Sequence, residues 1–421
     1  MRAELTGRWH GGCVVAPPSK SMAHRALICA ALAEGESCIE NIAHSKDIDA
    51  TAGALRSFGA HIAFSGDGAA VVQGTGGRVH TPKEPVWCCE SGSTLRFLIP
   101  LGALCGAPVH FCGAGRLFQR PQTVYEQLFA QRGIAFSQTA DGVCVDGRLS
   151  AGEFCVDGGV SSQFISGLAL AAPLLGADSV IRVRPPFESR SYVQLTRSAM
   201  AAFGVDSKWL DENTLLVDKN QKYTKSNYKV EGDASQAAFF GVLGAVCGKI
   251  CLQGLCPESA QGDMAFLSVL RRAGAIILAA EDGFWFEKAP LSGGEASLAD
   301  CPDLGPILMV LGLFCENGLV LRQAQRLRLK ESDRIAAMEE EIRKMGGRIE
   351  SDGGTVRIRK SALHGAVLYA HNDHRVAMAM AVAALAAGVP VVIEGAECVE
   401  KSWPEFWQVL QTCLGAEVKL V

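Results

Sequence analysis

The feature that most limits what this chain can fold into is a glycine that recurs about every 70 residues. Six apolar, helix-like stretches each end at such a glycine and lead into a strand-like run, as in ALICAALAEGESCIEN. A glycine is expected there because the chain leaves a helix through positive φ. The stretches are apolar almost all the way round, which predicts helices buried inside a layer. The glycines of this first series are Gly35, Gly106, Gly176, Gly248, Gly318 and Gly388.

A second glycine series lies between the members of the first. Its members are Gly59, Gly133, Gly204, Gly274, Gly346 and Gly415. The stretches before these glycines are amphipathic: in one of them Ile335, Met338, Ile342 and Met345 recur at steps of three and four. Each repeat is therefore predicted to hold a buried helix, a strand, a surface helix and another strand, which gives an α/β fold.

Six repeats of this length exceed one hydrophobic core of ordinary size, so two domains of three repeats each are predicted. The lysine-rich stretch NQKYTKSNYK precedes the expected boundary, near residues 228–231. We predict an N-terminal lobe at 13–231 and a C-terminal lobe at 232–421. Because the sixth repeat uses the whole C-terminus, residues 1–12 are expected to complete the second lobe. The chain would then cross between the lobes twice.

Composition narrows the class of protein. No run approaches the roughly 20 apolar residues of a membrane span, and the start MRAELTGRWHGG lacks the apolar segment of a signal peptide, so a soluble, cytoplasmic protein is predicted. The net charge of −4 gives no field that would attract nucleic acid. The 16 cysteines include no CxxC pair and are interpreted as small buried thiols rather than disulfides or metal ligands.

Positive charge gathers where the buried helices are expected to begin. Lys20 and Arg25 belong to the first start, Arg96 to the second, and His374 and Arg375 to the sixth. Cations at this end oppose the helix dipole, so capping alone does not explain them. A bound phosphate or carboxylate does explain them, because helix N-termini and basic side chains together bind anions. The pattern predicts an anion site.

Further charged residues stand where the amphipathic helices begin: Arg120, Lys330, Glu331, Arg334 and Lys401. Each of them, taken alone, favours a solvent-exposed first turn. They share one phase of the repeat, however, and repeats of one fold place equivalent turns on one face. We therefore expect these side chains and the buried-helix starts to converge on a cleft between two domains.

Other common chemistries find little support. The chain contains no GxxxxGK[ST] loop, no HExxH and no GxSxG. His371 and His374 offer only two metal ligands, and no third presents itself. The sequence therefore predicts neither a metal nor an organic cofactor.

A series of motifs runs along the chain: SKSMAHRALICAALAEG, ESGSTLRFL, QRPQ, SSQFISGLALAAPLL, SRSYVQLT, EGDASQAAFF, CPDLGPIL, LKESDRI, NDHRVAMA and KSWPEFW. These motifs are spread over nearly all six repeats, and in their order they resemble those of the EPSP synthase (3-phosphoshikimate 1-carboxyvinyltransferase) family. The resemblance implies the enolpyruvyl transferase fold: two similar domains, each of three βαβαββ-type repeats around buried parallel helices, with the active site in the interdomain cleft. It implies transfer of the enolpyruvyl group of phosphoenolpyruvate to the 5-hydroxyl of shikimate 3-phosphate, with release of phosphate, by addition and elimination. We expect a monomer.

The resemblance also implies roles for individual residues. Phosphate would be held by Lys20, Arg120 and Lys401, and the phosphoenolpyruvate carboxylate by Arg334 and Arg375, with Lys330 also in the substrate-binding set. Shikimate 3-phosphate would be held by Ser21, Arg25, Ser161, Ser162, Ser189 and Tyr192, and Gln163 would touch both substrates. Asp303 and Glu331 are the implied acid and base. Lys20 can also give a proton to the leaving phosphate, and Gly92 leaves room for the donor.

These residue types suit the reaction. Phosphoenolpyruvate brings about three negative charges and its partner a similar number, so holding them together needs fixed cations in a water-poor site. Two carboxyl groups can supply the proton transfers of addition and elimination. Arginine suits a planar carboxylate because its guanidinium is bidentate.

Five positions depart from the commonest pattern of the family: Pro18, His24, Glu90, Phe97 and Arg326. Glu90 replaces an asparagine and adds an acid near anionic ligands, which is expected to weaken binding unless Arg96 or a lysine offsets it. The departures bear on affinity and inhibitor sensitivity rather than on the class of reaction.

Three alternatives stay open. The enolpyruvyl transferase that acts on UDP-N-acetylglucosamine in cell-wall synthesis usually has a reactive cysteine five residues before the equivalent of Arg120, but here Gly115 holds that position and Cys112 lies farther away. An RNA-terminal phosphate cyclase of related repeats is disfavoured by the near-neutral charge. A non-catalytic anion-binding member of the fold is disfavoured because Lys20, Asp303, Glu331 and Lys401 are all present.

Overall fold

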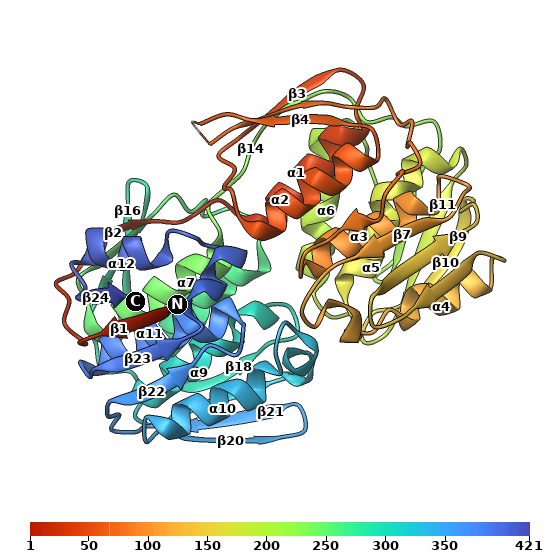
Figure 1. Cartoon of the computed structure of the whole chain (residues 1–421). Coiled ribbons are helices and arrows are strands. Elements are labelled where there is room, and N and C mark those ends of the chain that lie inside the picture. The colour runs from red at the N-terminus through yellow and green to blue at the C-terminus, as the bar shows by residue number, and fades with distance from the viewer. Residues whose placement is uncertain (67) are drawn as a thin grey trace. The chain divides into compact units, whose positions relative to one another are not determined.

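The computed structural model describes residues 1–66 and 68–421 (Figure 1). The glycine repeat predicted from the sequence is confirmed in the backbone. All twelve glycines of the two series have positive φ, from 60° at Gly415 to 107° at Gly59. An L-residue with a side chain would be strained at most such positions, which is why the repeat is visible in the sequence.

The chain forms two compact units. Unit 1 comprises Met1–Pro17 and Glu231–Val421, and unit 2 comprises Pro18–Val230. Each unit has its own hydrophobic core and three four-stranded sheets. Among the residues that the structure describes, no helix is both long enough and apolar enough to cross a membrane.

Unit 2 contains three βαβαββ repeats. The first consists of β14 (Asn227–Lys229), α1 (Lys20–Leu32), β3 (Glu36–Glu40), α2 (Lys46–Ser57), β4 (His61–Phe64) and β5 (Ala70–Gln73). The second consists of β6 (Val86–Trp87), α3 (Gly92–Gly102), β7 (Val109–Cys112), η1 (Leu117–Gln119), α4 (Thr123–Ala130), β8 (Ala135–Gln138) and β9 (Gly142–Asp146). The third consists of β10 (Gly152–Asp157), α5 (Ser162–Ala171), η2 (Ala172–Leu175), β11 (Ser179–Arg184), α6 (Arg190–Ala202), β12 (Lys208–Trp209) and β13 (Thr214–Val217).

Unit 1 repeats this plan. Its first repeat consists of β2 (Gly12–Val15), α7 (Ala234–Cys247), β15 (Ile250–Gln253), η3 (Gly262–Met264), α8 (Ala265–Arg272), β16 (Ile276–Ala280) and β17 (Gly283–Glu287). The second consists of β18 (Gly294–Ser297), η4 (Pro302–Leu304), α9 (Gly305–Phe314), β19 (Leu319–Arg322), η5 (Gln325–Leu329), α10 (Arg334–Lys344), β20 (Arg348–Asp352) and β21 (Thr355–Arg359). The third consists of β22 (Ala366–Tyr369), α11 (His374–Ala387), β23 (Val391–Glu394), η6 (Ala396–Lys401), α12 (Phe406–Leu414), β24 (Val418–Leu420) and β1 (Arg2–Leu5).

The helices after the first strands are buried, as predicted. Every residue of α7 from Ala234 to Ala245 is buried, and so is every residue of α11 from His374 to Leu385. Helices without a polar face are stable only inside a core. The prediction of one strand after each surface helix is incomplete, because a two-stranded hairpin such as β4–β5 follows instead.

The two units exchange their first strands. β2 precedes α1 of unit 2 in sequence but pairs in parallel with β15 of unit 1, whereas β14 precedes α7 of unit 1 but pairs in parallel with β3 of unit 2. Residues 13–17 therefore belong to unit 1, and the chain crosses after Pro17 rather than at the predicted residue 13. β1 pairs with β23 and β24, which brings the two chain ends side by side in unit 1 (Figure 1).

Candidate active site

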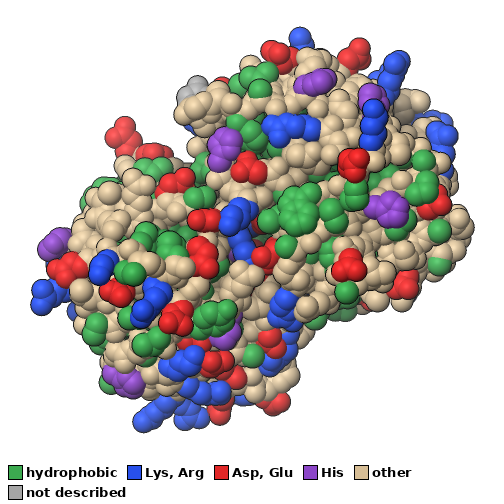
Figure 2. Space-filling view, in the orientation of Figure 1, with side chains coloured by type: hydrophobic (Ala, Val, Ile, Leu, Met, Phe, Trp, Pro, Cys, Tyr) green, Lys and Arg blue, Asp and Glu red, His purple; other side chains and the backbone are tan. Residues whose placement is uncertain are grey.

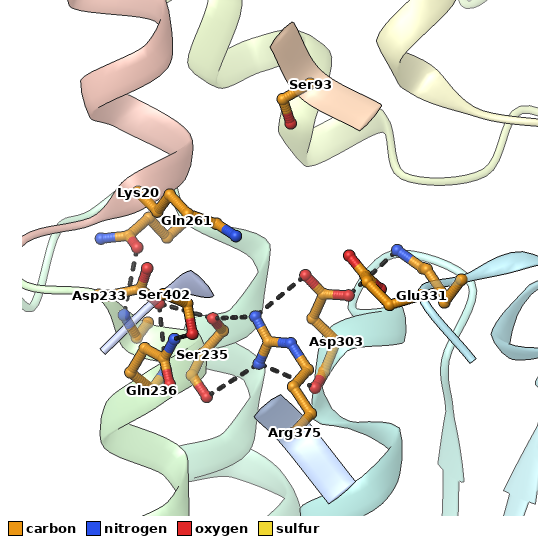
Figure 3. Close-up of polar contacts among 12 residues, drawn as sticks. Lys20, Ser93, Asp233, Ser235, Gln236, Gln261, Asp303, Glu331, Arg375 and Ser402 are labelled. Carbon is orange, nitrogen blue, oxygen red and sulfur yellow. Dashed lines mark hydrogen bonds and ion pairs between the residues drawn. The ribbon is translucent and has the colours of Figure 1, made fainter. Parts of the chain in front are cut away.

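In unit 1, the N-terminal turns of the three buried helices meet around Arg375 (Figure 3). Arg375 stands in the first turn of α11, whose N-cap Asp373 accepts a hydrogen bond from the Arg375 amide at 2.9 Å. The guanidinium donates to Ser235 Oγ on α7 at 2.8 Å and to Asp303 Oδ2, just before α9, at 3.2 Å. The three buried-helix starts of unit 1 therefore come together within that unit.

Asp303 is surrounded by cations. Its carboxylate contacts Lys330 and Arg334 at 3.1 Å each, besides Arg375. Burial alone would raise the pKa of Asp303, but the three cations hold the pKa of that carboxyl well below its usual range. Burial also lowers the pKa of Lys330, an effect that Asp303 partly opposes. Asp303 is therefore ionised while its cations remain in place.

Arg334 lies deepest in this cluster, with 1% of its side chain exposed. It donates to Asp373 at 2.8 Å, to Glu331 at 2.7 Å and to Asp303 at 3.1 Å. Burial opposes its charge, but Asp373, Glu331 and Asp303 together raise the pKa of Arg334 above its usual value. We name the six residues Asp303, Lys330, Glu331, Arg334, Asp373 and Arg375 the compensated cluster, because three cations meet three carboxylates.

Lys401 joins the same region through the turn before α11. Its side-chain amine donates to the carbonyl oxygen of Asn372 at 2.7 Å, and the residue is 6% exposed. Asn372 has φ 52° and directly precedes Asp373. Ser402, which follows Lys401 in the sequence, accepts a hydrogen bond from Gln236 Nε2 on α7 at 2.9 Å.

In unit 2, the first turn of α1 carries Lys20 and Ser21. The Lys20 amine lies 2.6 Å from Asp47 Oδ2 in the first turn of α2. Arg25, one turn farther along α1, is 2% exposed and donates to the Ser21 carbonyl at 2.6 Å, to Thr196 Oγ1 at 2.7 Å and to the Tyr192 carbonyl at 3.0 Å. Burial lowers the pKa of Arg25 to about 10. Arg25 therefore fixes the two segments that carry Ser21 and Tyr192.

A second network of unit 2 joins α3 and α5. Gln163 donates to Ser93 Oγ at 2.9 Å and accepts from Arg96 at 2.9 Å. Ser161 is the N-cap of α5 and accepts from the Gln163 amide, and the adjacent Ser162 is buried. Ser189 has φ 55° at the start of α6, where it is also buried. The serines predicted for shikimate 3-phosphate thus stand at helix starts.

Arg120 differs from every cation described so far. The residue is 7% exposed, its Nε is buried, and no hydrogen bond or ion pair joins its guanidinium to any residue in the described part of the chain. The guanidinium packs against Gly92, the first residue of α3. A Cβ at residue 92 would stand 2.7 Å from Arg120 Nη1 and 2.8 Å from Cζ. Glycine is therefore what allows Arg120 to approach the start of α3.

Several residues that contact the predicted ones were not singled out from the sequence, among them Asp47, Ser93, Ser235 and Asp373. Asp373 lies inside the NDHR motif, where an aspartate before a helix is explained by capping alone. The partners of Ser93 and Ser235 come from other repeats, whereas Asp47 pairs with Lys20 of its own repeat. Nothing in the local sequence of these three residues indicates the pairing.

Two of the departures from the family's pattern, Glu90 and Arg326, make local contacts that the structure describes. A Cβ at Gly115 would lie 2.3 Å from Glu90 Oε2, so the Glu90 carboxylate occupies the space that a cysteine at residue 115 would need. Arg326 is 7% exposed and donates to the Ala299 carbonyl at 3.0 Å. The charge of Arg326 also contributes to lowering the pKa of Lys330.

On the face shown in Figure 2, basic and acidic side chains are interspersed.

The one group of potential metal ligands in the described residues consists of Glu340, Glu341 and His371. Lys344 lies 2.8 Å from Glu340 and 2.9 Å from Glu341, and His371 lies 2.7 Å from Glu341. The Lys344 amine already pairs with both glutamates, and His371 hydrogen-bonds to Glu341, so these residues form a polar network of their own. His374 is not a member of this group.

The comparisons with known proteins agree with the fold and the motifs. The family described as EPSP synthase (3-phosphoshikimate 1-carboxyvinyltransferase) matches residues 8–410. A 3-phosphoshikimate 1-carboxyvinyltransferase of Clostridium kluyveri is 39% identical over 411 residues, 97% of this chain and 96% of the relative. One of Clostridium acetobutylicum is 40% identical over 413 residues, with the same coverage of both chains.

Solved structures share the fold. An EPSP synthase from Acinetobacter baumannii superposes with a TM-score of 0.80 at 24% identity and covers 100% of both chains. The enolpyruvyl transferase NikO from Streptomyces tendae gives a TM-score of 0.80 at 16% identity, over 99% of this chain and 98% of its own. The predicted α/β fold of two three-repeat domains is confirmed. With a match to the family along nearly its whole length, the chain belongs to the EPSP synthase family.

Proposed function

We propose that this chain catalyses the reaction for which its family is named. The enolpyruvyl group of phosphoenolpyruvate is transferred to the 5-hydroxyl of shikimate 3-phosphate, and phosphate is released. Both substrates are small and strongly anionic, so the protein must supply buried positive charge. The family match and the number of buried cations support this assignment.

The observation that carries the proposal is the Arg120 guanidinium, whose buried Nε has no hydrogen-bond partner and which forms no ion pair with the residues that the structure describes. A buried cation without a counter-ion is costly, so proteins keep one where a ligand supplies the missing charge. Gly92 makes room for this arrangement at a helix N-terminus, which itself favours anions. We assign Arg120, with Lys20 and Lys401, to the transferred phosphate. Lys20 is also the proton donor to that leaving group.

The compensated cluster supports acid–base chemistry. We assign the phosphoenolpyruvate carboxylate to Arg334 and Arg375, with Lys330 beside them. An incoming carboxylate competes with Asp303 and Glu331 for these cations. A carboxyl group that loses a cationic partner has a higher pKa and becomes a better base. Substrate binding would in this way prepare Glu331 and Asp303 for proton transfer.

Shikimate 3-phosphate is assigned to unit 2. Ser161, Ser162, Ser189 and Tyr192 supply hydroxyl groups, and we assign Gln163, which accepts a hydrogen bond from Arg96, to contact both substrates. Arg25 holds the Ser21 and Tyr192 segments in place through their carbonyls. We expect the enzyme to be a cytoplasmic monomer, which size-exclusion chromatography coupled to light scattering tests for the oligomeric state.

A phosphate-release assay tests the proposed reaction. The purified chain is incubated with phosphoenolpyruvate and either shikimate 3-phosphate or UDP-N-acetylglucosamine. We expect phosphate release only with shikimate 3-phosphate, together with a product that retains the enolpyruvyl group. Release only with the UDP-sugar would replace this assignment by the cell-wall reaction, and release with neither acceptor would favour a non-catalytic role.

A further inference from the structure

Two cysteines face each other on neighbouring strands of unit 1. β2 and β15 run parallel, and their register pairs Cys13 with Cys251. The flanking register pair, Val14 with Leu252, is fully buried in the core. Because side chains alternate along a strand, both cysteines point to the opposite face of the sheet. The two sulfur atoms therefore share one side of one strand pair.

The two thiols differ in their surroundings. Cys13 is exposed, whereas Cys251 is buried and lies between Cys13 and Trp285 in the register of the sheet. Burial, and next the neighbouring Cys13 thiol, raise the pKa of Cys251 to about 11. Cys13 is consequently the thiol that a dissolved reagent meets first, and Cys251 is within reach of whatever forms on it.

The backbone geometry permits a disulfide. Register partners on neighbouring strands lie about 4.8 Å apart, inside the range of roughly 4.4–6.8 Å between Cα atoms that disulfides span. No strand has to move by a residue to bring the sulfur atoms together.

We propose that Cys13 and Cys251 form an oxidisable dithiol that closes to a disulfide on reaction with a peroxide. The Cys13 thiolate attacks one oxygen of the peroxide, so an S–O bond forms and the O–O bond breaks. The other oxygen leaves as alkoxide or hydroxide and takes up a proton from solvent to give an alcohol or water. The Cys251 sulfur then attacks the Cys13 sulfur, forms the S–S bond and expels hydroxide, which takes up the thiol proton as water. The two sulfur atoms lose two electrons, and the peroxide gains them.

The position of this pair in the chain gives the bond a consequence. β2 leads into the first crossing and β15 follows the second, so residues 13 and 251 enclose all of unit 2 in the sequence. A disulfide here would close a covalent loop around unit 2. Cross-links across long loops restrict the unfolded chain most. The oxidised protein should therefore have a higher urea midpoint than the reduced protein.

Cys155 provides a matched control. It is also exposed and lies on β10, a strand that pairs in parallel with β11, but its register partner is Arg182 rather than a cysteine. A sulfenic acid on Cys155 has no thiol opposite it and is expected to proceed to sulfinic acid. A sulfenic acid on Cys13 should not be oxidised to sulfinic acid, because the Cys251 thiol reacts with it first to form the disulfide.

The test is mass spectrometry of the full chain after hydrogen peroxide treatment, alkylation and proteolysis. We expect a linked peptide containing Cys13 and Cys251 that dithiothreitol cleaves, while Cys155 accumulates sulfinic acid that dithiothreitol does not reverse. In Cys251→Ser and Cys251→Ala, Cys13 should oxidise like Cys155. Absence of the linked peptide in the unmodified chain, or sulfinic acid forming on Cys13 equally fast with and without Cys251, would overturn the proposal.

Discussion

Arg334 in unit 1 and Arg120 in unit 2 are both buried arginines, but their guanidinium groups have opposite surroundings. Arg334 contacts three carboxylates and is 1% exposed. Arg120 is nearly as buried, yet no acid or carbonyl of the described residues accepts from its guanidinium. One cation is neutralised by the protein, and the other is left for a ligand.

The difference separates two ways of building an anion site. A compensated cation is already neutralised by protein carboxylates, so it binds a substrate carboxylate by releasing one of them. The pKa of the released protein carboxylate then rises, and this group can accept a proton. An unpartnered cation costs stability but binds an anion without first losing a partner. The following predictions test whether the two arginines really differ in this respect.

The largest expected effect is on stability. Arg334→Gln leaves Asp303, Glu331 and Asp373 without their shared cation and should cost about 3–5 kcal/mol of unfolding free energy. Arg120→Gln removes a buried charge that has no partner among the described residues, so it should raise the free energy of unfolding, by about 1 kcal/mol, rather than lower it. Urea unfolding of both variants measures this, and equal losses would show that the two arginines are held alike.

The next effect is on turnover. Glu331→Gln should keep substrate binding and reduce kcat at least about a hundredfold, as expected on removal of a general acid or base. Glu340→Gln is the control, because Glu340 lies on the adjoining helix α10, is 55% exposed and contacts Lys344. Steady-state kinetics with direct binding of shikimate 3-phosphate distinguishes the two. Near-normal turnover in Glu331→Gln would remove this residue from the mechanism.

A smaller effect is expected on affinity. In Gly92→Ala the new Cβ would meet the Arg120 guanidinium at 2.7 Å, so the arginine must shift. Displacing a substrate-binding group by a fraction of an ångström should raise KM for phosphoenolpyruvate about tenfold. Gly53→Ala is the matched control, since Gly53 also lies in a helix, α2, and nothing stands within 4 Å of its Cβ position. Similar kinetics in both variants would mean that Arg120 does not bind this substrate.

The smallest effect concerns pH. His24 is buried, and its Nδ1 shares a hydrogen bond with Thr51 Oγ1. The pKa of His24 is lowered well below its usual value, first by burial and then by the charges of Lys20 and Arg25. In the unfolded chain His24 therefore takes up a proton near pH 6.5, whereas in the folded chain it stays neutral at this pH. Stability is full above this pH and falls as pH decreases toward the folded pKa, by up to about 1.4 kcal/mol per pH unit.

His24→Asn removes this contribution. Between pH 7.5 and pH 5.5 the unmodified chain should lose about 1 kcal/mol more unfolding free energy than His24→Asn. Urea unfolding at the two pH values gives the difference, in which the contributions of all other titrating groups cancel. Equal losses would place the proton of His24 outside this pH range.

Much of the fold could be predicted because the ends of its helices require a particular residue type, glycine. Positive φ at Gly59 and Gly388 excludes most side chains, so the repeat is recorded in the residue type itself. Which strands β2 and β14 pair with could not be predicted. An alternating strand pattern shows which face is buried, but not which sheet the strand joins.

The candidate site divides in the same way. Cations at helix starts, such as Arg375, conflict with the helix dipole, and this conflict is visible in a sequence. Whether a cation has a counter-ion depends on contacts across repeats, such as that of Arg334 with Asp373. The unpartnered state of Arg120 and its dependence on Gly92 therefore emerge only from the structure.

A crystal structure with phosphoenolpyruvate and shikimate 3-phosphate bound together tests the central claim most directly. We predict a substrate oxygen within about 3 Å of the Arg120 guanidinium, and a substrate carboxylate in place of at least one protein carboxylate on Arg334 or Arg375. A complex in which both substrates are ordered while Arg120 contacts neither of them would contradict the account.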